Sequence, residues 1–179
     1  MSMEIILDKE QKIGFYAGSF DPFTNGHLHV VKKAAALFDK VIIGIGINPK
    51  KTRRFEINIM LEAINKTLQE ENLINVEVIK YEGLTAKVAK DNGCTYLIRG
   101  IRNGMDYEYE ENIAAINEEI SDLDTIYIRA GKLGIVSSSM VMELCSNSMD
   151  ISKYVPNEIA KVVELSHIYH KIERKFDNE

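Results

Sequence analysis

Short apolar runs alternate with longer amphipathic stretches along this chain, and that alternation limits the folds it can adopt. The clearest run, 41–47, holds no charged or polar side chain, which is typical of a central parallel strand covered on both faces. Four more strands are predicted at 13–17, 76–79, 95–98 and 125–128. Helices are predicted between them at 26–38, 57–70, 84–92 and 107–120, and again after 137 and after 156.

Strands that are each followed by a helix predict an α/β fold with a doubly wound, Rossmann-like sheet of five parallel strands. At 179 residues the chain fits a single domain, 1–179. Within it we expect 1–11 to be an N-terminal extension and 167–179 to be a charged C-terminal tail that frays or pairs with a neighbour. Sheets of this kind bind ligands outside the carboxyl ends of their strands, so the segments after the strands are the candidate site.

Charge and cysteine content exclude several classes of protein. A net charge of −5 argues against a broad nucleic-acid surface, which would need a basic face. The acidic N-terminus lacks the apolar core of a signal peptide, and no apolar run approaches the roughly 20 residues that span a bilayer. Cys94 and Cys145 form no CxxC pair and are predicted to be buried, reduced thiols. We therefore expect a cytoplasmic protein that binds neither nucleic acid nor membrane.

The segment 18–27, GSFDPFTNGH, follows the first predicted strand and opens the first helix. Gly18 and Gly26 allow tight turns and a close approach of the backbone to a ligand. Ser19 and Thr24 add hydroxyls, and the N–H groups of a helix start attract phosphate. His27 lies in the first helical turn, where Nε2–H is placed to donate to a phosphate oxygen that gains charge in a transition state. The segment is neither a Walker A loop nor a GxGxxG motif.

The same segment resembles the T/HxGH signature of the nucleotidylyltransferase superfamily, with 24–27 filling the four places, and its longer form resembles that of bacterial phosphopantetheine adenylyltransferases. The resemblance extends from Lys12 to about Leu165. It includes 48–55 (NPKKTRRF), 83–85 (GLT), 99–102 (RGIR), 106–110 (DYEYE), 136–139 (VSSS) and 150–156 (DISKYVP). It implies transfer of AMP from ATP to 4′-phosphopantetheine, which gives dephospho-coenzyme A and pyrophosphate by direct in-line attack on the α-phosphate.

The resemblance also implies a role for each matching residue. The catalytic residues are His27, Lys51 and Ser19, and the acceptor is bound by Ser19, Lys51, Thr85 and Arg99. ATP is bound by Ser19, Phe20, His27, Gly100, Ile101, Arg102, Glu110, Gly134, Ile135, Val136, Ser137, Ser138 and Ser139. Mg²⁺ enters with ATP, because the sequence shows no carboxylate cluster for a dedicated metal site.

Physical chemistry supports these residue types. Arginine suits bidentate phosphate binding and is costly to bury without an anion. Capping of a helix start needs one serine, so three in succession at 137–139 favour a phosphate site as well. A phosphate acceptor is already a nucleophile, so positioning and charge stabilisation suffice and no Ser-His-Asp or Cys-His set is needed.

Two departures from the family pattern and two alternatives qualify this interpretation. The loop 131–135 lacks the aromatic and serine usual before SSS, which affects adenine packing, and 58–60 (NIM) replaces a Glu-Arg pair, which predicts altered helix anchoring.

One alternative is the same chemistry on nicotinamide mononucleotide or on a cytidylyltransferase acceptor. The other is a nucleotide- or coenzyme-A-binding module without catalysis. The resemblance further implies a homohexamer and inhibition by coenzyme A.

Overall fold

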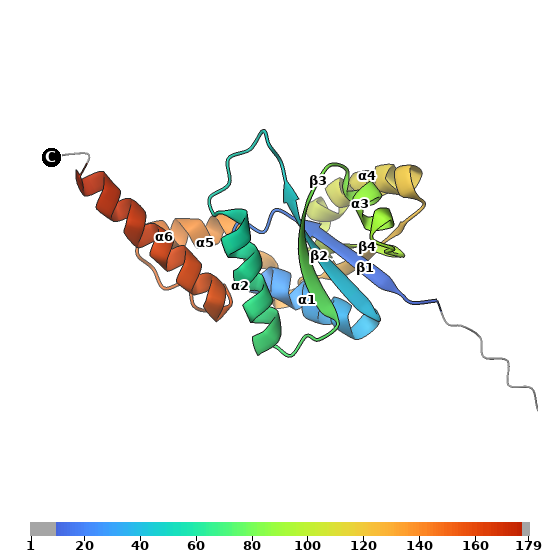
Figure 1. Cartoon of the computed structure of the whole chain (residues 1–179), viewed down its shortest axis with the longest axis horizontal. Helices are drawn as coiled ribbons and strands as arrows, with labels where there is room; N and C mark the ends of the chain where they lie inside the picture. The colour runs from blue at the N-terminus through green and yellow to red at the C-terminus, as the bar shows by residue number, and fades with distance from the viewer. Residues whose placement is uncertain (1–9, 177–179) are drawn as a thin grey trace, which may run out of the picture.

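The computed structural model describes residues 10–176, so most of the predicted 1–11 extension lies outside the described residues. Its five strands are β1 (Ile13–Gly18), β2 (Lys40–Ile47), β3 (Val76–Glu82), β4 (Tyr96–Ile101) and β5 (Asp124–Arg129). All neighbours pair in parallel, in the order β3-β2-β1-β4-β5 (Figure 1). The predicted α/β fold with a five-stranded parallel sheet is confirmed, and all five carboxyl ends lie along one edge.

The helices divide between the two faces of this sheet (Figure 1). On one face lie α1 (Asn25–Leu37), α2 (Ile57–Glu70), α5 (Ser138–Ser146) and α6 (Asn157–Phe176), whose buried residues join the larger core. On the other face lies α3 (Thr85–Asp91), which packs against α4 (Gly104–Ser121). A short 3₁₀ helix, η1 (Gly131–Ile135), links β5 to α5.

Alternating strand residues build the two cores. Tyr16, Ile43 and Ile98 belong to the core beneath α1, whereas Phe15 and Ile42 belong to the core beneath α3. Burial of one such side chain contributes about 1.5–3 kcal/mol. The continuous apolar run of β2 is therefore explained, because a strand covered on both faces needs apolar side chains at every position.

Several predicted boundaries differ from the observed ones. The bounds of α2 were predicted correctly, but β4 was predicted to end at 98 and continues through Ile101. The reason is tertiary, since Arg99 to Ile101 pair with Tyr127 to Arg129 of β5. The charged tail after 167 was expected to fray or to pair with a neighbour, and α6 continues into it through Phe176. Cys94 and Cys145 are both buried thiols, as predicted. Over residues 10–176, no helix has the length and apolar character to cross a membrane.

The altered sequence 58–60 anchors α2 in its own way. Glu56 caps the helix by accepting the Ile59 N–H at 2.9 Å. Met60 is fully buried in the larger core, and the Asn58 amide oxygen accepts from Lys80 Nζ at 2.8 Å. These contacts join α2 to the sheet where a Glu-Arg pair was expected.

Candidate active site

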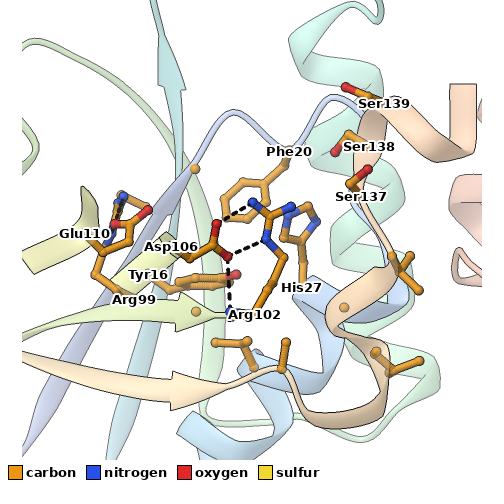
Figure 2. Close-up of a pocket in the computed structure, with 18 residues that line it drawn as sticks. Tyr16, Phe20, His27, Arg99, Arg102, Asp106, Glu110, Ser137, Ser138 and Ser139 are labelled. Atoms are coloured by element: carbon orange, nitrogen blue, oxygen red, sulfur yellow. Dashed lines mark hydrogen bonds and ion pairs between the residues drawn. The ribbon is translucent and has the colours of Figure 1, made fainter. Parts of the chain in front are cut away.

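A pocket of about 330 Å³ lies at the carboxyl edge of the sheet, between β1 and β4 (Figure 2). The strand order reverses between these two strands, and such a switch point is where open α/β sheets bind ligands. The walls come from β1, β4, α1, α4 and the segment from Ala130 to Ser139. The predicted residues that line this pocket are Phe20, His27, Arg99, Gly100, Arg102, Glu110, Val136, Ser137, Ser138 and Ser139.

His27 is held by a capping box at the start of α1. The Thr24 backbone N–H donates to His27 Nδ1 at 3.0 Å, and the Thr24 hydroxyl accepts the His27 backbone N–H at 3.4 Å. The rings of Phe20 and Phe23 pack against the imidazole with centroid distances of 5.1 and 5.5 Å. Because Nδ1 accepts a hydrogen bond, we assign the proton of the neutral ring to Nε2.

Electrostatics keep this imidazole neutral. Burial and, to a smaller extent, the positive charge of Arg102 together lower the pKa of His27 from 6.5 to about 4. Figure 2 shows Arg102 beside His27 in the pocket. At neutral pH the ring is therefore an uncharged Nε2–H donor, which suits hydrogen bonding to an anion more than proton transfer.

Two arginines of the pocket are paired with carboxylates from the first turns of α4 (Figure 2). Arg99 forms a hydrogen bond and an ion pair with Glu110. The Arg102 guanidinium donates to Asp106 from Nε at 2.7 Å and from Nη2 at 2.9 Å, and the Arg102 backbone N–H donates at 3.2 Å. The hydrogen bond to Arg102 lowers the pKa of Asp106 and raises that of Arg102. Each of the two guanidinium groups of the site therefore has a carboxylate partner.

The three serines of 137–139 have different surroundings. Ser137 caps α5 by accepting the Met140 N–H at 3.1 Å. Ser138 Oγ donates to the Pro22 carbonyl at 2.8 Å, which ties α5 to the loop before α1. Ser139 follows on the pocket wall. The start of α5 thus faces the same pocket as His27, and backbone N–H groups at a helix start attract anions.

The loop before α5 reaches the pocket through residues that the sequence did not predict. Ala130 and Leu133 line it, whereas Gly134 and Ile135 do not, and the Ile135 side chain is exposed. A Cβ on Gly26 would lie 3.3 Å from the Leu133 carbonyl oxygen, so glycine allows α1 and η1 to approach closely. Ile101, another predicted nucleotide contact, is also absent from the pocket lining.

Ser19 and Lys51 lie in a second hollow of about 410 Å³, which they share with Asp21, Asn48 and Arg53. It adjoins the first pocket along the chain, because Gly18 lines that pocket and Ser19 lines this hollow. The structure therefore places the predicted catalytic residues in two neighbouring hollows.

Thr85 lines neither of these hollows. Its hydroxyl lies 2.7 Å from Tyr81 Oη, and a Cβ on Gly46, which lines the second hollow, would lie 3.2 Å from the same oxygen. Tyr81 thus connects the start of α3 to the second hollow.

Sequence reasoning missed several residues of these sites. Tyr16 lines the first pocket, and burial raises its pKa above the ordinary value. Asp106 lies in the resembling segment 106–110 but was assigned no role there, and only its contact with Arg102 reveals its place. Asp21 and Arg53 lie in segments that the motifs cover, but their contact joins positions 32 residues apart. No spacing rule signals such a pair.

Comparison with known proteins identifies relatives over most of the chain. A family model described as cytidylyltransferase-like matches residues 15–144. A phosphopantetheine adenylyltransferase of Cytophaga hutchinsonii is 42% identical over 150 residues, which cover 83% of this chain and 99% of that protein. One from Porphyromonas gingivalis is 41% identical over 148 residues (82% and 95%), and one from Leuconostoc mesenteroides is 40% identical over 154 residues (85% and 94%).

Solved structures share the fold at low sequence identity. A putative nicotinate-nucleotide adenylyltransferase from Vibrio parahaemolyticus superposes with a TM-score of 0.66 at 18% identity, over 86% of this chain and 98% of that one. A Plasmodium falciparum nicotinic acid mononucleotide adenylyltransferase complexed with NaAD gives a TM-score of 0.66 at 16% identity, over 89% and 98%.

Proposed function

This chain belongs to the cytidylyltransferase-like family, and we propose that it transfers the adenylyl group of ATP to 4′-phosphopantetheine, with dephospho-coenzyme A and pyrophosphate as products. Identities of 40–42% across 82–85% of the chain to three phosphopantetheine adenylyltransferases carry this conclusion. The reaction class is that of a nucleotidyltransferase.

In this proposal the nucleotide occupies the pocket between β1 and β4. The neutral Nε2–H of His27 donates to an α-phosphate oxygen, whose negative charge grows as phosphorus becomes pentavalent. The N–H groups at the start of α5, with Ser138 and Ser139, receive the outer phosphates. Of the remaining predicted nucleotide contacts, those that line this pocket are Phe20, Gly100, Arg102, Glu110, Val136 and Ser137. Those outside its lining are Ser19, Ile101, Gly134 and Ile135.

The acceptor phosphate approaches from the second hollow. Ser19 and Lys51 bind and orient it there, Arg99 holds it from the first pocket, and Thr85 contacts the amide-bearing arm. One phosphate oxygen forms a bond to the α-phosphorus while the bond from that phosphorus to the bridging oxygen breaks, and pyrophosphate leaves with the electron pair. To take part, Arg99 must exchange its ion pair with Glu110 for one with the acceptor phosphate.

Mg²⁺ fits this site as a partner of the nucleotide. Asp106 and Glu110, two carboxylates of the pocket, are each engaged by an arginine, and the described side chains, 10–169, contain no group of three or more His, Cys, Asp or Glu that could hold a metal ion. The triphosphate and water would therefore supply the ligands, and the ion would neutralise the leaving pyrophosphate.

We further propose a cytoplasmic location, a homohexamer and inhibition by coenzyme A.

The choice of acceptor is tested by release of pyrophosphate from ATP or CTP with 4′-phosphopantetheine or nicotinamide mononucleotide. The expected result is rapid release with ATP and 4′-phosphopantetheine alone. Faster release with the mononucleotide or with CTP would assign another acceptor or nucleotide. Tight binding of ATP without release on any acceptor would indicate a binding module.

A further inference from the structure

The loop between β2 and α2, 48–56, is fastened to the loop after β1 through one buried carboxylate. Asp21 Oδ2 accepts the Arg54 N–H at 2.8 Å, and Oδ1 accepts the Phe55 N–H at 3.1 Å. Arg54 Nη1 also donates to the Asp21 carbonyl at 3.0 Å. Asp21 is 8% exposed, so these bonds are shielded from competing water.

Arg53 joins the same two loops from the other side. Its Nη1 donates to the Ser19 carbonyl at 2.9 Å, and its Nε donates to the Phe55 carbonyl at 3.3 Å. Its Nη2 lies 3.6 Å from Asp21 Oδ1, and the side chain is 18% exposed. The Arg53 guanidinium therefore links the loop 48–56 to the loop that carries Ser19, the residue proposed to orient the acceptor phosphate.

Lys51 lies two residues before Arg53, outside the contacts that join the two loops. Its backbone N–H donates to the Asn48 carbonyl at 3.0 Å, which closes a turn, but the residue itself is exposed. A lysine side chain carries about 2 kcal/mol of rotamer entropy, so a useful position depends on where its backbone is fixed. The contacts of Asp21 and Arg53 fasten the loop two to four residues after Lys51.

We infer that Asp21 and Arg53 are positioning residues that hold Lys51 next to Ser19, an inference that rests on the proposed function. An unfastened loop would let Lys51 drift from the acceptor phosphate, and displacements of about 1 Å can cost a hundredfold in rate. The pair thus couples the acceptor-binding loop to the phosphate-binding loop.

A double-mutant cycle tests whether Arg53 acts through Lys51. The variants are Arg53→Met, Lys51→Ala and the double variant. Lys50→Met is the matched control, because this substitution also removes one positive charge from the same loop, at an exposed position. Arg53→Met is expected to lower kcat/KM for 4′-phosphopantetheine about 10- to 100-fold, with Kd for ATP changed less than about twofold. In the Lys51→Ala background it should change kcat/KM less than about threefold.

A second readout follows the loop without any substrate. Endoproteinase Lys-C cleaves after lysine, so cutting after Lys51 in the native protein measures how firmly the loop is held. Arg53→Met and Asp21→Asn are expected to accelerate this cut about tenfold or more, whereas Lys50→Met should not. Mass spectrometry of the fragments identifies the site of cleavage.

Two outcomes would overturn the inference. In the first, Arg53→Met costs the same factor with and without Lys51, so that Arg53 contributes independently. In the second, the Lys-C rate after Lys51 is unchanged in both Arg53→Met and Asp21→Asn. A wild-type protein that does not use 4′-phosphopantetheine would instead refute the proposed function, while the proteolysis would still test the connection.

Discussion

Replacement of His27 by alanine tests the central interaction of the proposed mechanism. Loss of a single hydrogen-bond donor to a developing oxyanion costs about 10²–10³ in kcat, or about 2.7–4 kcal/mol. Because Nε2 would contribute mainly in the transition state, the Kd for ATP should change little. The steady-state rate of pyrophosphate release, with ATP binding measured by calorimetry, separates the two effects.

The structure also predicts what this variant does to folding. His27→Ala leaves the Thr24 N–H without its acceptor and opens space between two phenylalanine rings. Loss of the cap costs about 1 kcal/mol, which lowers Tm by about 2–4 °C in a chain of this length. The protein should therefore remain folded at 25 °C, and a kinetic defect cannot be attributed to unfolding.

His29 provides the matched control, since it lies two positions further on α1, about 200° around the helix. A Cβ on Gly131 would lie 3.7 Å from its Nε2, so its ring faces η1. His29→Ala should retain kcat within about threefold. Near-normal turnover in His27→Ala, or equal losses in the two variants, would refute the assignment of His27 as the donor to the α-phosphate.

The remaining predictions concern pH, packing and charge. The pKa of His27 is about 4 in the folded protein against 6.5 in the unfolded chain, so the folded state loses stability as pH falls from 6.5 to 4. The expected loss in the free energy of unfolding is about 3 kcal/mol. Urea unfolding should show this loss in the wild type and little of it in His27→Ala. Because the neutral ring is the active form, kcat should show no loss attributable to His27 between pH 6 and 8, and a decrease above pH 6.5 that disappears in His27→Gln would contradict this. Gly44→Ala should destabilise by about 1–3 kcal/mol in thermal unfolding, since the new Cβ would lie 2.4 Å from Phe15 Cζ; an unchanged Tm would show that the two strands can separate freely. Asp106→Asn should tighten ATP binding about two- to fivefold by calorimetry, because Arg102 no longer has to leave a carboxylate, and weaker binding would show that Asp106 orients Arg102 for the nucleotide.

The sequence alone was sufficient for the elements of the fold and for the chemistry of one loop. The strand–helix alternation is a local pattern, so it predicted five parallel strands and both bounds of α2. The histidine in the first turn after GSFDPFTNG was likewise recognisable from adjacent residues. Its capping contact with Thr24 spans only three positions, which is why local spacing could indicate its place.

The tertiary structure decided what depends on residues far apart in the chain. Arg99 became part of a strand because β5 pairs with it, and its partner Glu110 comes from α4. The division of the predicted catalytic residues between two hollows follows from where β1 and β2 end. The contact of Asp21 with Arg53 exists only once these two loops lie side by side. Such contacts are set by the packing of whole elements, and no periodicity or spacing in the sequence records them.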